Sequence, residues 1–310
     1  MKVLVAGSTG LVGTALTKVF RSYGYEVIGV NRKVLDLTNF QETTDFICSL
    51  RPEVVVDAAA FVGGIAANNS RPVEFLMQNL QIQNNLMAAA HKSNVNKFIF
   101  LASSCVYPKD TPQPIKEEYL LTGPLEETNS AYAIAKIAGI EMINSYRKEF
   151  GLKWITLMPS NLYGPFDNFN LETSHVIPAL LRKFLEGKKH GKEFVEVWGT
   201  GRPRREFLHV DDLASAVMVA LERYDSNLHL NVGTGKDMSI NELAIKIACI
   251  VGFHGEIKWN TGRPDGTPQK VLDISRISSL GWRPSITLDD GISSTLTWLE
   301  NAMETGAVRL

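Results

Sequence analysis

The feature that most constrains the fold is a glycine-rich turn close to the N-terminus. The turn directly follows a short apolar run and opens a stretch with helical spacing; it reads Gly7-Ser8-Thr9-Gly10-Leu11-Val12-Gly13. In such a strand-turn-helix unit the first glycine permits a tight turn, the second lets the backbone approach a pyrophosphate, and the third lets helix and strand pack closely. The helix N-terminus then presents free N–H groups to the phosphates. The turn therefore predicts a dinucleotide site, and the alternative is a loop that merely contains glycines.

Short apolar runs alternate with longer helical patterns in the first half of the chain. The runs are rich in Val, Ile, Leu and Phe without strict alternation, which is typical of strands buried on both faces. The expected strands are Lys2–Ala6, Glu26–Val30, Val54–Ala58, Lys97–Ala102 and Trp154–Met158, and the expected helices between them are Val12–Tyr23, Thr38–Ser49, Val73–Ser93 and Ala131–Phe150. This order predicts an α/β fold with a Rossmann-type, doubly wound parallel sheet.

The character of the sequence changes after Pro159. Pro, Gly, Asn and charged residues become frequent from Tyr163 onward, and helical patterns at 176–186 and 241–251 are separated by irregular segments. We therefore expect a Rossmann domain over residues 1–163 and a smaller, mainly C-terminal α/β substrate domain over 164–310. His209-Val210-Asp211-Asp212 has the pattern of a helix N-cap before the apolar helix Leu213–Leu221, so a segment near 207–235 is expected to return to the first domain.

Charge and cysteine content exclude several classes of partner. The 32 basic and 33 acidic residues give a net charge of −1, so no global basic field would attract nucleic acid or a membrane surface. No apolar stretch approaches the ~20 residues of a spanning helix, and the N-terminal run is interpreted as a first strand, not a signal peptide. Cys48, Cys105 and Cys249 are too few and too scattered for a disulfide scaffold or a zinc site. We expect a reducing, cytoplasmic compartment and no metal.

The end of the second expected strand bears on the choice of dinucleotide. An NAD site usually has an acidic residue there, which binds the ribose 2′-OH, whereas a 2′-phosphate favours arginine. This chain has neutral Asn31 followed by Arg32 and Lys33. The pattern predicts NADPH, with Asn31 and Arg32 at the site; the alternative is that both basic residues are ordinary solvated charges.

Tyr132 and Lys136 are spaced for acid–base chemistry. A separation of four residues puts the phenol and the ammonium on one helix face. Because a nearby cation favours phenolate, we expect the pKa of Tyr132 to fall from about 10 toward neutrality. Such a group suits the interconversion of a carbonyl and an alcohol.

Ser103 and Cys105 follow the fourth expected strand, and the carboxyl ends of strands in open α/β sheets carry the ligands. Ser103 could bond a substrate oxygen and the tyrosine hydroxyl, or it could cap a turn. A lone cysteine is by default a small buried hydrophobe, and Cys48 and Cys249 fit that default. Cys105 lies instead in a polar turn, where a thiol with a lowered pKa could act as a base.

His175 begins an apolar helix pattern, and the simplest interpretation is a surface histidine at a helix N-terminus. The other histidines show no metal-ligand spacing, and His209 is most simply structural.

Taken together, these motifs resemble the extended short-chain dehydrogenase/reductase superfamily and, more narrowly, its GDP-L-fucose synthase family, nearly from end to end. The segments that carry the narrower resemblance are Val62–Asn69, Ser103-Ser104-Cys105-Val106-Tyr107-Pro108, Tyr132-Ala133-Ile134-Ala135-Lys136, Met158–Pro165, Ser174-His175-Val176-Ile177-Pro178, Arg205–Asp212 and Pro264-Asp265-Gly266-Thr267-Pro268. The glycine turn marks only the fold, whereas the serine-cysteine and histidine segments together mark the subfamily.

The resemblance implies roles for individual residues. Ser103, Tyr132 and Lys136 would serve a reduction, and Cys105 and His175 would be the base and acid of an epimerisation. The NADP(H) site would comprise Gly7, Ser8, Thr9, Gly10, Leu11, Val12, Gly13, Asn31, Arg32, Leu101, Ala102, Ser103, Ser104, Lys136, Pro159, Ser160, Asn161, Leu162 and His175. The GDP moiety would meet Lys183, Trp198, Arg205 and Asp265.

Two positions depart from the family pattern. Lys183 stands where the family has arginine, so the charge is kept but the planar fork is lost. Phe61 replaces the lysine expected before Val62-Gly63-Gly64.

The resemblance also implies an activity and an assembly. The family carries out 3,5-epimerisation and then NADPH-dependent 4-reduction of GDP-4-keto-6-deoxy-D-mannose, and it acts as a homodimer. One alternative is another nucleotide-sugar enzyme of the superfamily, a 4-epimerase or 4,6-dehydratase, which recycles its cofactor. A second is a non-catalytic regulator that senses a dinucleotide, although such a sensor needs none of the acid–base residues.

Overall fold

A six-stranded parallel sheet forms the centre of the computed structural model, which describes residues 1–262 and 265–308; Pro264 of the expected 264–268 motif lies outside them. The strand order is β2-β1-β3-β4-β5-β9. These strands are β1 (Lys2–Ala6), β2 (Glu26–Val30), β3 (Val54–Asp57), β4 (Lys97–Leu101), β5 (Ile155–Pro159) and β9 (Leu230–Val232). The order reverses direction beside β1, as in a doubly wound fold, so the predicted fold class is confirmed.

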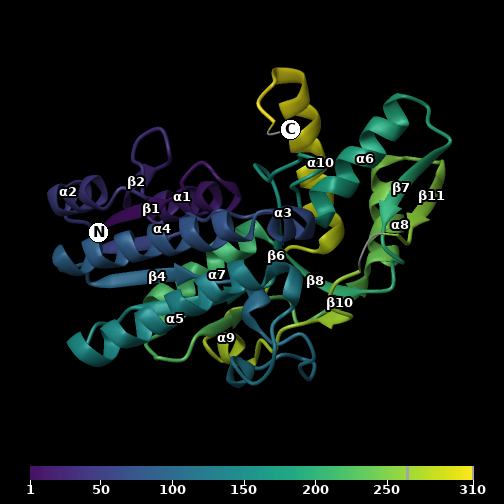
Figure 1. Ribbon diagram of the computed structural model, residues 1–310. Coiled ribbons are helices and arrows are strands. Elements are labelled where there is room, and N and C mark those ends of the chain that lie inside the picture. The colour runs from purple at the N-terminus through teal and green to yellow at the C-terminus, as the bar shows by residue number, and fades with distance from the viewer. Residues whose placement is uncertain (263–264, 309–310) are drawn as a thin grey trace.

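Helices cover both faces of this sheet (Figure 1). They are α1 (Leu11–Ser22), α2 (Phe40–Leu50), α3 (Ile65–Ser70), α4 (Pro72–Lys92), α5 (Ser130–Phe150), α6 (Val176–Lys189), α7 (Val210–Arg223), α8 (Ile240–Val251), α9 (Ser275–Ser279) and α10 (Leu288–Thr305), with 3-10 turns η1 (Ser104–Val106), η2 (Glu117–Tyr119) and η3 (Glu127–Asn129). The expected strands and helices in the first half are present, with ends shifted by at most two residues. For example, α2 starts at Phe40 because Asn39 is its N-cap and accepts a hydrogen bond from the Glu42 N–H.

Alternating strand residues build two separate cores. Leu4, Val55 and Phe100 face a core closed by α2, α4 and α5. Val3 and Val5 on the other side of the pleat pack with α1 and α7. Because both faces are buried, the strands are apolar throughout, which explains the unbroken runs in the sequence.

The C-terminal region has its own core and smaller sheets. Strands β6 (Asn161–Tyr163), β8 (Arg204–His209), β10 (Asp237–Ser239) and β12 (Gln269–Lys270) form one sheet, and β7 (Phe194–Trp198) pairs with β11 (Glu256–Asn260). Their apolar side chains pack with α6, α8 and α10, on the right of Figure 1. The segment at 207–235 connects the two parts, since α7 packs with α1 against the large sheet and β9 extends that sheet beside β5.

One prediction about burial is wrong. Cys249 was expected to be a buried hydrophobe, but it is exposed, and Cys48 is only half-buried. Helix α8 turns Leu243, Ile247 and Val251 into the core, and the face that carries Cys249 points outward. Apolar neighbours in sequence do not identify the buried face of a helix that is apolar nearly all round.

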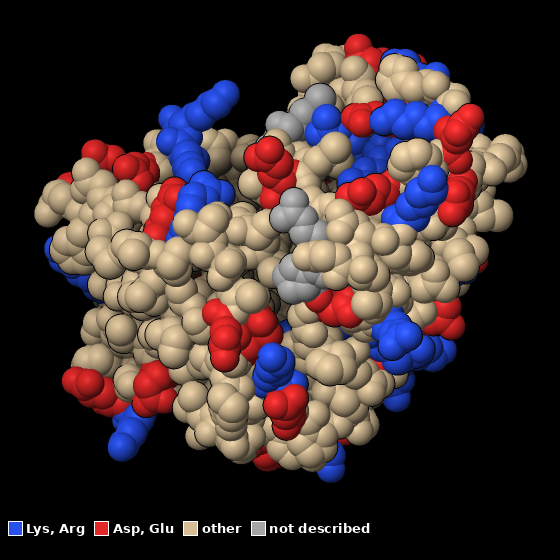
Figure 2. Space-filling model, turned by 45° about the vertical axis from the view of Figure 1, so that its right-hand side comes forward, with Lys and Arg blue, Asp and Glu red and all other residues tan. Residues whose placement is uncertain are grey.

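The charge distribution on the surface agrees with the net charge near zero. Figure 2 shows acidic and basic side chains interspersed over one face, with basic side chains gathered in a recess at the upper right. Within the described ranges no helix has the length and apolar character needed to cross a membrane.

Candidate active site

The glycine turn has the geometry that a dinucleotide requires. Gly7 has a φ of +76°, and a Cβ added there would lie 2.6 Å from the Ala58 carbonyl oxygen. A Cβ on Gly13 would lie 2.1 Å from the Gly7 carbonyl oxygen, so helix α1 packs against the turn without room for a side chain. Gly10 is the N-cap of α1 and contributes no side-chain cap, which leaves the first N–H groups of the helix available. These features fit a bound pyrophosphate.

Basic side chains gather beside the end of β2. The Arg32 guanidinium lies 5.8 Å from the centre of the Phe61 ring and donates a hydrogen bond to Gln78 Oε1 at 3.3 Å. Arg71 lies over the same ring at 5.4 Å. Phe61, which replaces the expected lysine, thus brings two guanidinium groups together by cation–π contact. Asn31 Oδ1 accepts a hydrogen bond from the Lys33 N–H and shapes the turn.

The remaining expected cofactor residues follow strands β4 and β5. Leu101 ends β4, Ala102 donates its N–H to the Leu157 carbonyl, and Ser104 is buried. Pro159 ends β5 and Ser160 donates its N–H to the Val232 carbonyl. All lie at the carboxyl edge of the sheet, where the glycine turn also lies.

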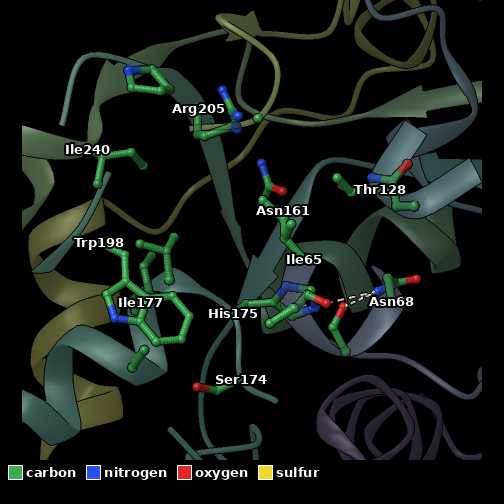
Figure 3. Close-up of a pocket in the computed structure, with 18 of the residues that line it drawn as sticks. Ile65, Asn68, Thr128, Asn161, Ser174, His175, Ile177, Trp198, Arg205 and Ile240 are labelled. Atoms are coloured by element: carbon green, nitrogen blue, oxygen red, sulfur yellow. Dashed lines mark hydrogen bonds between the residues drawn. The ribbon is translucent and has the colours of Figure 1, made fainter. Parts of the chain in front are cut away.

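A cavity of about 610 Å³ opens between the large sheet and the C-terminal region. Its size suits a small-molecule ligand. Figure 3 shows His175, Trp198 and Arg205 around the same open space, although η1, α6 and β8 contribute to its walls from distant parts of the chain.

The cavity brings together most of the side chains that the sequence identified. Its lining includes the expected catalytic residues Ser103, Cys105, Tyr132 and His175, and the expected nucleotide contacts Lys183, Trp198, Arg205 and Asp265. Ser104, Asn161 and Leu162 also contribute. Lys136 is buried and is not part of the lining. The other expected cofactor residues outside the lining are the glycine turn, Asn31, Arg32, Leu101, Ala102, Pro159 and Ser160.

The prediction of a lowered pKa for Tyr132 is wrong. Burial raises the pKa of Tyr132, and the charges of Cys105 and Asp57 raise it further. Lys136 Nζ lies 5.9 Å from the centre of the tyrosine ring and donates its hydrogen bond to the Leu101 carbonyl at 3.0 Å. Burial also lowers the pKa of Lys136. The spacing of four places the two residues on one helix face, but desolvation by burial decides the direction of the Tyr132 shift.

Cys105 is buried in the turn η1, and burial raises its pKa above the usual range for a thiol. Lys270 opposes this effect most strongly, followed by a hydrogen bond from Ser103 and the charge of Lys136. Ser103 Oγ also accepts a hydrogen bond from the Cys105 N–H at 3.5 Å, so Ser103 does cap the turn. Thiolate formation here depends on the two lysines.

His175 is the N-cap of α6, but its side chain makes no capping hydrogen bond. The His175 imidazole is exposed on the side that faces the cavity. Protein atoms surround it on its other sides, and the resulting desolvation lowers its pKa. His209, in contrast, accepts a hydrogen bond from the Asp211 N–H through Nδ1 and caps α7, which is a structural role.

The nucleotide end of the cavity combines a ring with cations. Lys183 Nζ lies 5.3 Å from the centre of the Trp198 ring and donates to the Glu196 carbonyl at 2.9 Å. Arg205 donates to the backbone of Arg204 and, at 3.5 Å, to the Asp265 carbonyl. The Asp265 carboxylate accepts hydrogen bonds from the N–H and hydroxyl of Thr200 at 2.7 and 2.8 Å. An indole face beside two cations suits a base and a diphosphate.

Three charged groups of this site were missed from the sequence. Glu126 and Lys270 line the cavity, and Asp57 interacts with both Lys136 and Tyr132. Asp57 had a recognisable signal, because it ends a buried parallel strand at the ligand-binding edge. Lys270 had none, since its short strand β12 reaches the site only by pairing with β8. Over residues 1–262 and 265–308, no cluster of His, Cys, Asp and Glu could hold a metal ion.

Comparisons with known proteins agree with this geometry. The model of the NAD dependent epimerase/dehydratase family matches residues 3–233. GDP-L-fucose synthase 1 of Arabidopsis thaliana is 49% identical over 298 residues, covering 96% of this chain and 92% of the relative. GDP-L-fucose synthase of Escherichia coli K12 is 47% identical over 311 residues, covering 97% of each. The crystal structure of a GDP-L-fucose synthetase from Naegleria fowleri bound to NADP superposes with a TM-score of 0.90 at 28% identity, covering 100% of this chain and 96% of that one.

Proposed function

Since this chain belongs to the NAD dependent epimerase/dehydratase family, we propose that it converts GDP-4-keto-6-deoxy-D-mannose to GDP-L-fucose with NADPH, as a 3,5-epimerase and 4-reductase. The observation that carries this proposal is the lining of one cavity by a thiol, an imidazole and a tyrosine, from Cys105, His175 and Tyr132. Reduction alone requires only the tyrosine and its partners, whereas inversion at two carbons needs a further base and acid.

The epimerisation follows from the chemistry of the substrate. Its C4 ketone acidifies the protons at C3 and C5, because either carbanion is an enolate. In our proposal Cys105 removes each proton from one face of the sugar and His175 returns a proton from the other, which inverts both centres. Lys270 and Lys136 support the thiolate against its buried surroundings. The lowered pKa of His175 makes its protonated form a ready acid.

The reduction uses the other group of side chains. NADPH supplies the hydride when bound. Ser103 orients the C4 oxygen, Tyr132 delivers the proton to it, and Lys136 binds the nicotinamide ribose and favours the tyrosinate that remains. The turn of Gly7, Gly10 and Gly13 holds the pyrophosphate, and Arg32 binds the 2′-phosphate. Lys183, Trp198, Arg205 and Asp265 bind the GDP moiety, with a lysine charge in place of the family's arginine fork.

The direct test is to incubate the protein with GDP-4-keto-6-deoxy-D-mannose and NADPH and to identify the sugar formed. We expect GDP-L-fucose and one NADPH oxidised for each product molecule. A 4-epimerase or a 4,6-dehydratase would recycle its cofactor and leave NADPH unchanged. A dinucleotide sensor would bind NADPH and leave the sugar unchanged.

Two variants separate the proposed chemical roles. Cys105→Ser is expected to abolish solvent-deuterium incorporation at C3 and C5 while NADPH still binds, because the hydroxyl is a far weaker base at this position. Tyr132→Phe is expected to abolish reduction and to retain some exchange. Normal exchange by Cys105→Ser, or complete loss of exchange by Tyr132→Phe, would contradict the assignment.

We further propose a homodimer in the cytoplasm, with an NADP-binding domain over 1–163 joined by the returning segment near 207–235 and a GDP-sugar domain over 164–310. Exposed apolar side chains on the adjacent helices α4 and α5, namely Val73, Met77 and Ile134, support self-association. The three free cysteines are compatible with a reducing compartment. Light scattering should give about twice the mass of one chain, and Met77→Glu should reduce it to the monomer.

A further inference from the structure

Asp57 is a buried carboxyl group that the proposed mechanism does not use. It ends β3 with 1% of its surface exposed. Its Oδ1 accepts a hydrogen bond from the Ala59 N–H at 3.1 Å, while Oδ2 is buried and accepts none from the residues that the structure describes. An unpaired carboxylate oxygen inside a protein is unfavourable unless a nearby positive charge compensates for it.

The compensating charge is Lys136. Strands β3 and β4 pair so that Asp57 lies opposite Phe100. Lys136 Nζ lies 4.7 Å from the centre of the Phe100 ring and is anchored to the carbonyl of the next residue, Leu101. The ammonium is therefore held against the strand beside Asp57. The two groups act on each other through charge, because Asp57 opposes the effect of burial on Lys136 and Lys136 opposes it on Asp57.

We propose that Asp57 is the counter-ion of Lys136 and, through it, a positioning residue for the 4-reduction; this inference rests on the proposed function. Lys136 is only 3% exposed and has a single carbonyl acceptor in the described structure. A buried ammonium with so little compensation tends to lose its proton. A neutral amine would not favour the tyrosinate of Tyr132. Asp57 keeps Lys136 charged without touching the substrate.

The surroundings leave Asp57 as the principal acidic group at this position. Among the residues that the structure describes, Cys105 is the other group that favours the charged form of Lys136, and Tyr132 is the other titratable group that Asp57 affects. The neighbouring strand positions are Ala6 on β1 and Phe100 on β4. The side chains that α4 buries are all uncharged. Burial raises the pKa of Asp57 to about 6, so the carboxylate predominates above that pH.

The test is Asp57→Asn, which removes the charge and keeps the shape. We expect kcat for NADPH oxidation to fall about tenfold or more, with the KM of the GDP-sugar within about twofold. The alkaline limb of the kcat–pH profile should move down by about one pH unit, since a neighbouring opposite charge shifts a pKa by one to three units. Exchange of deuterium at C3 and C5 should continue, because Lys270 lowers the pKa of Cys105 more strongly than Lys136 does.

Asp212→Asn is the matched control. Asp212 is equally buried at the start of α7 and accepts hydrogen bonds from the backbone of Ser285 and Ile286, far from Lys136 in the fold. This variant should lower Tm and leave the kcat–pH profile unchanged. An unchanged profile and kcat in Asp57→Asn would overturn the proposal.

If Asp57→Asn does not fold, a double variant tests whether Asp57 and Lys136 form a charge pair. Removing both charges in Asp57→Asn/Lys136→Met should then restore folding, because neither charge is left uncompensated. A double variant that also fails to fold would overturn the pairing. Absence of product from the wild-type protein would instead refute the proposed function. The comparison of folding in the single and double variants would still decide whether the two charges are paired.

Discussion

Replacing Gly13 by alanine tests the reasoning about the glycine turn most sharply. The new Cβ would lie 2.1 Å from the Gly7 carbonyl oxygen and 2.6 Å from Ser8 Cα. Ordinary contacts of this kind are about 3.5 Å or longer, and both neighbours are backbone atoms that no rotamer change can move. Helix α1 must therefore shift away from the turn.

The size of the effect follows from two opposing contributions. Overpacking of a rigid site costs about 3 kcal/mol, at the upper end of the usual range. Alanine regains up to about 1 kcal/mol over glycine within a helix. The net loss of about 2 kcal/mol corresponds to a fall in Tm of about 3 °C for a chain of this size.

Gly10→Ala is the control in the same turn. Its Cβ would lie 3.4 Å from the Gly7 carbonyl oxygen, which is tolerable, and Gly10 has a φ of −83° that alanine can adopt. Loss of glycine as N-cap costs below about 1 kcal/mol, so Tm should fall by no more than about 2 °C. Both substitutions should weaken NADPH binding, because one displaces the helix and the other obstructs the pyrophosphate.

Thermal unfolding without cofactor, followed by circular dichroism, gives the Tm values, and a fluorescence titration gives the Kd for NADPH. Equal Tm values for the two variants would refute the steric reasoning. Wild-type affinity for NADPH in Gly13→Ala would refute the assignment of the turn to the pyrophosphate.

Three further predictions concern other parts of the molecule. His229 is buried, and its Nε2 contacts the Tyr107 hydroxyl at 2.8 Å. Burial lowers the pKa of His229 to about 4, whereas the unfolded residue titrates near 6.5. Its contribution to stability, up to about 3 kcal/mol, is therefore complete above pH 6.5 and is lost as the pH falls toward 4. His229→Gln should flatten the dependence of Tm on pH in that window, and parallel curves would contradict this. Arg32→Ala should raise the Kd for NADPH about tenfold or more and leave that for NADH unchanged, since a charge-assisted bond contributes about 1.5–3 kcal/mol; equal losses for both dinucleotides would remove Arg32 from the 2′-phosphate. Lys183→Met should raise the KM of the GDP-sugar more than Lys183→Arg, because arginine keeps the cation beside Trp198; equal KM values would exclude a charge contact.

The residues of the candidate site could be proposed from motifs, but their electrostatics could not. Ser103, Cys105, Tyr132 and His175 were identified from their segments, and the structure places them on one cavity. The pKa of Tyr132 shifts in the direction opposite to the expected one, because burial and the charges of Cys105 and Asp57 all raise it. Asp57 and Lys270, which set the charge around Lys136 and Cys105, were absent from the sequence-based site.

Features that depend only on neighbours along the chain could be predicted from the sequence. The apolar strands, the helix starts and the conformational freedom at Gly7 are local, since they follow from periodicity, capping and φ values. Tertiary structure alone decided which face of α8 is buried, leaving Cys249 exposed, and which charges lie beside Lys136. Burial and the distance between charges depend on all the elements that pack around a residue, and residues such as Cys105 and Lys270 come together only when the chain is folded.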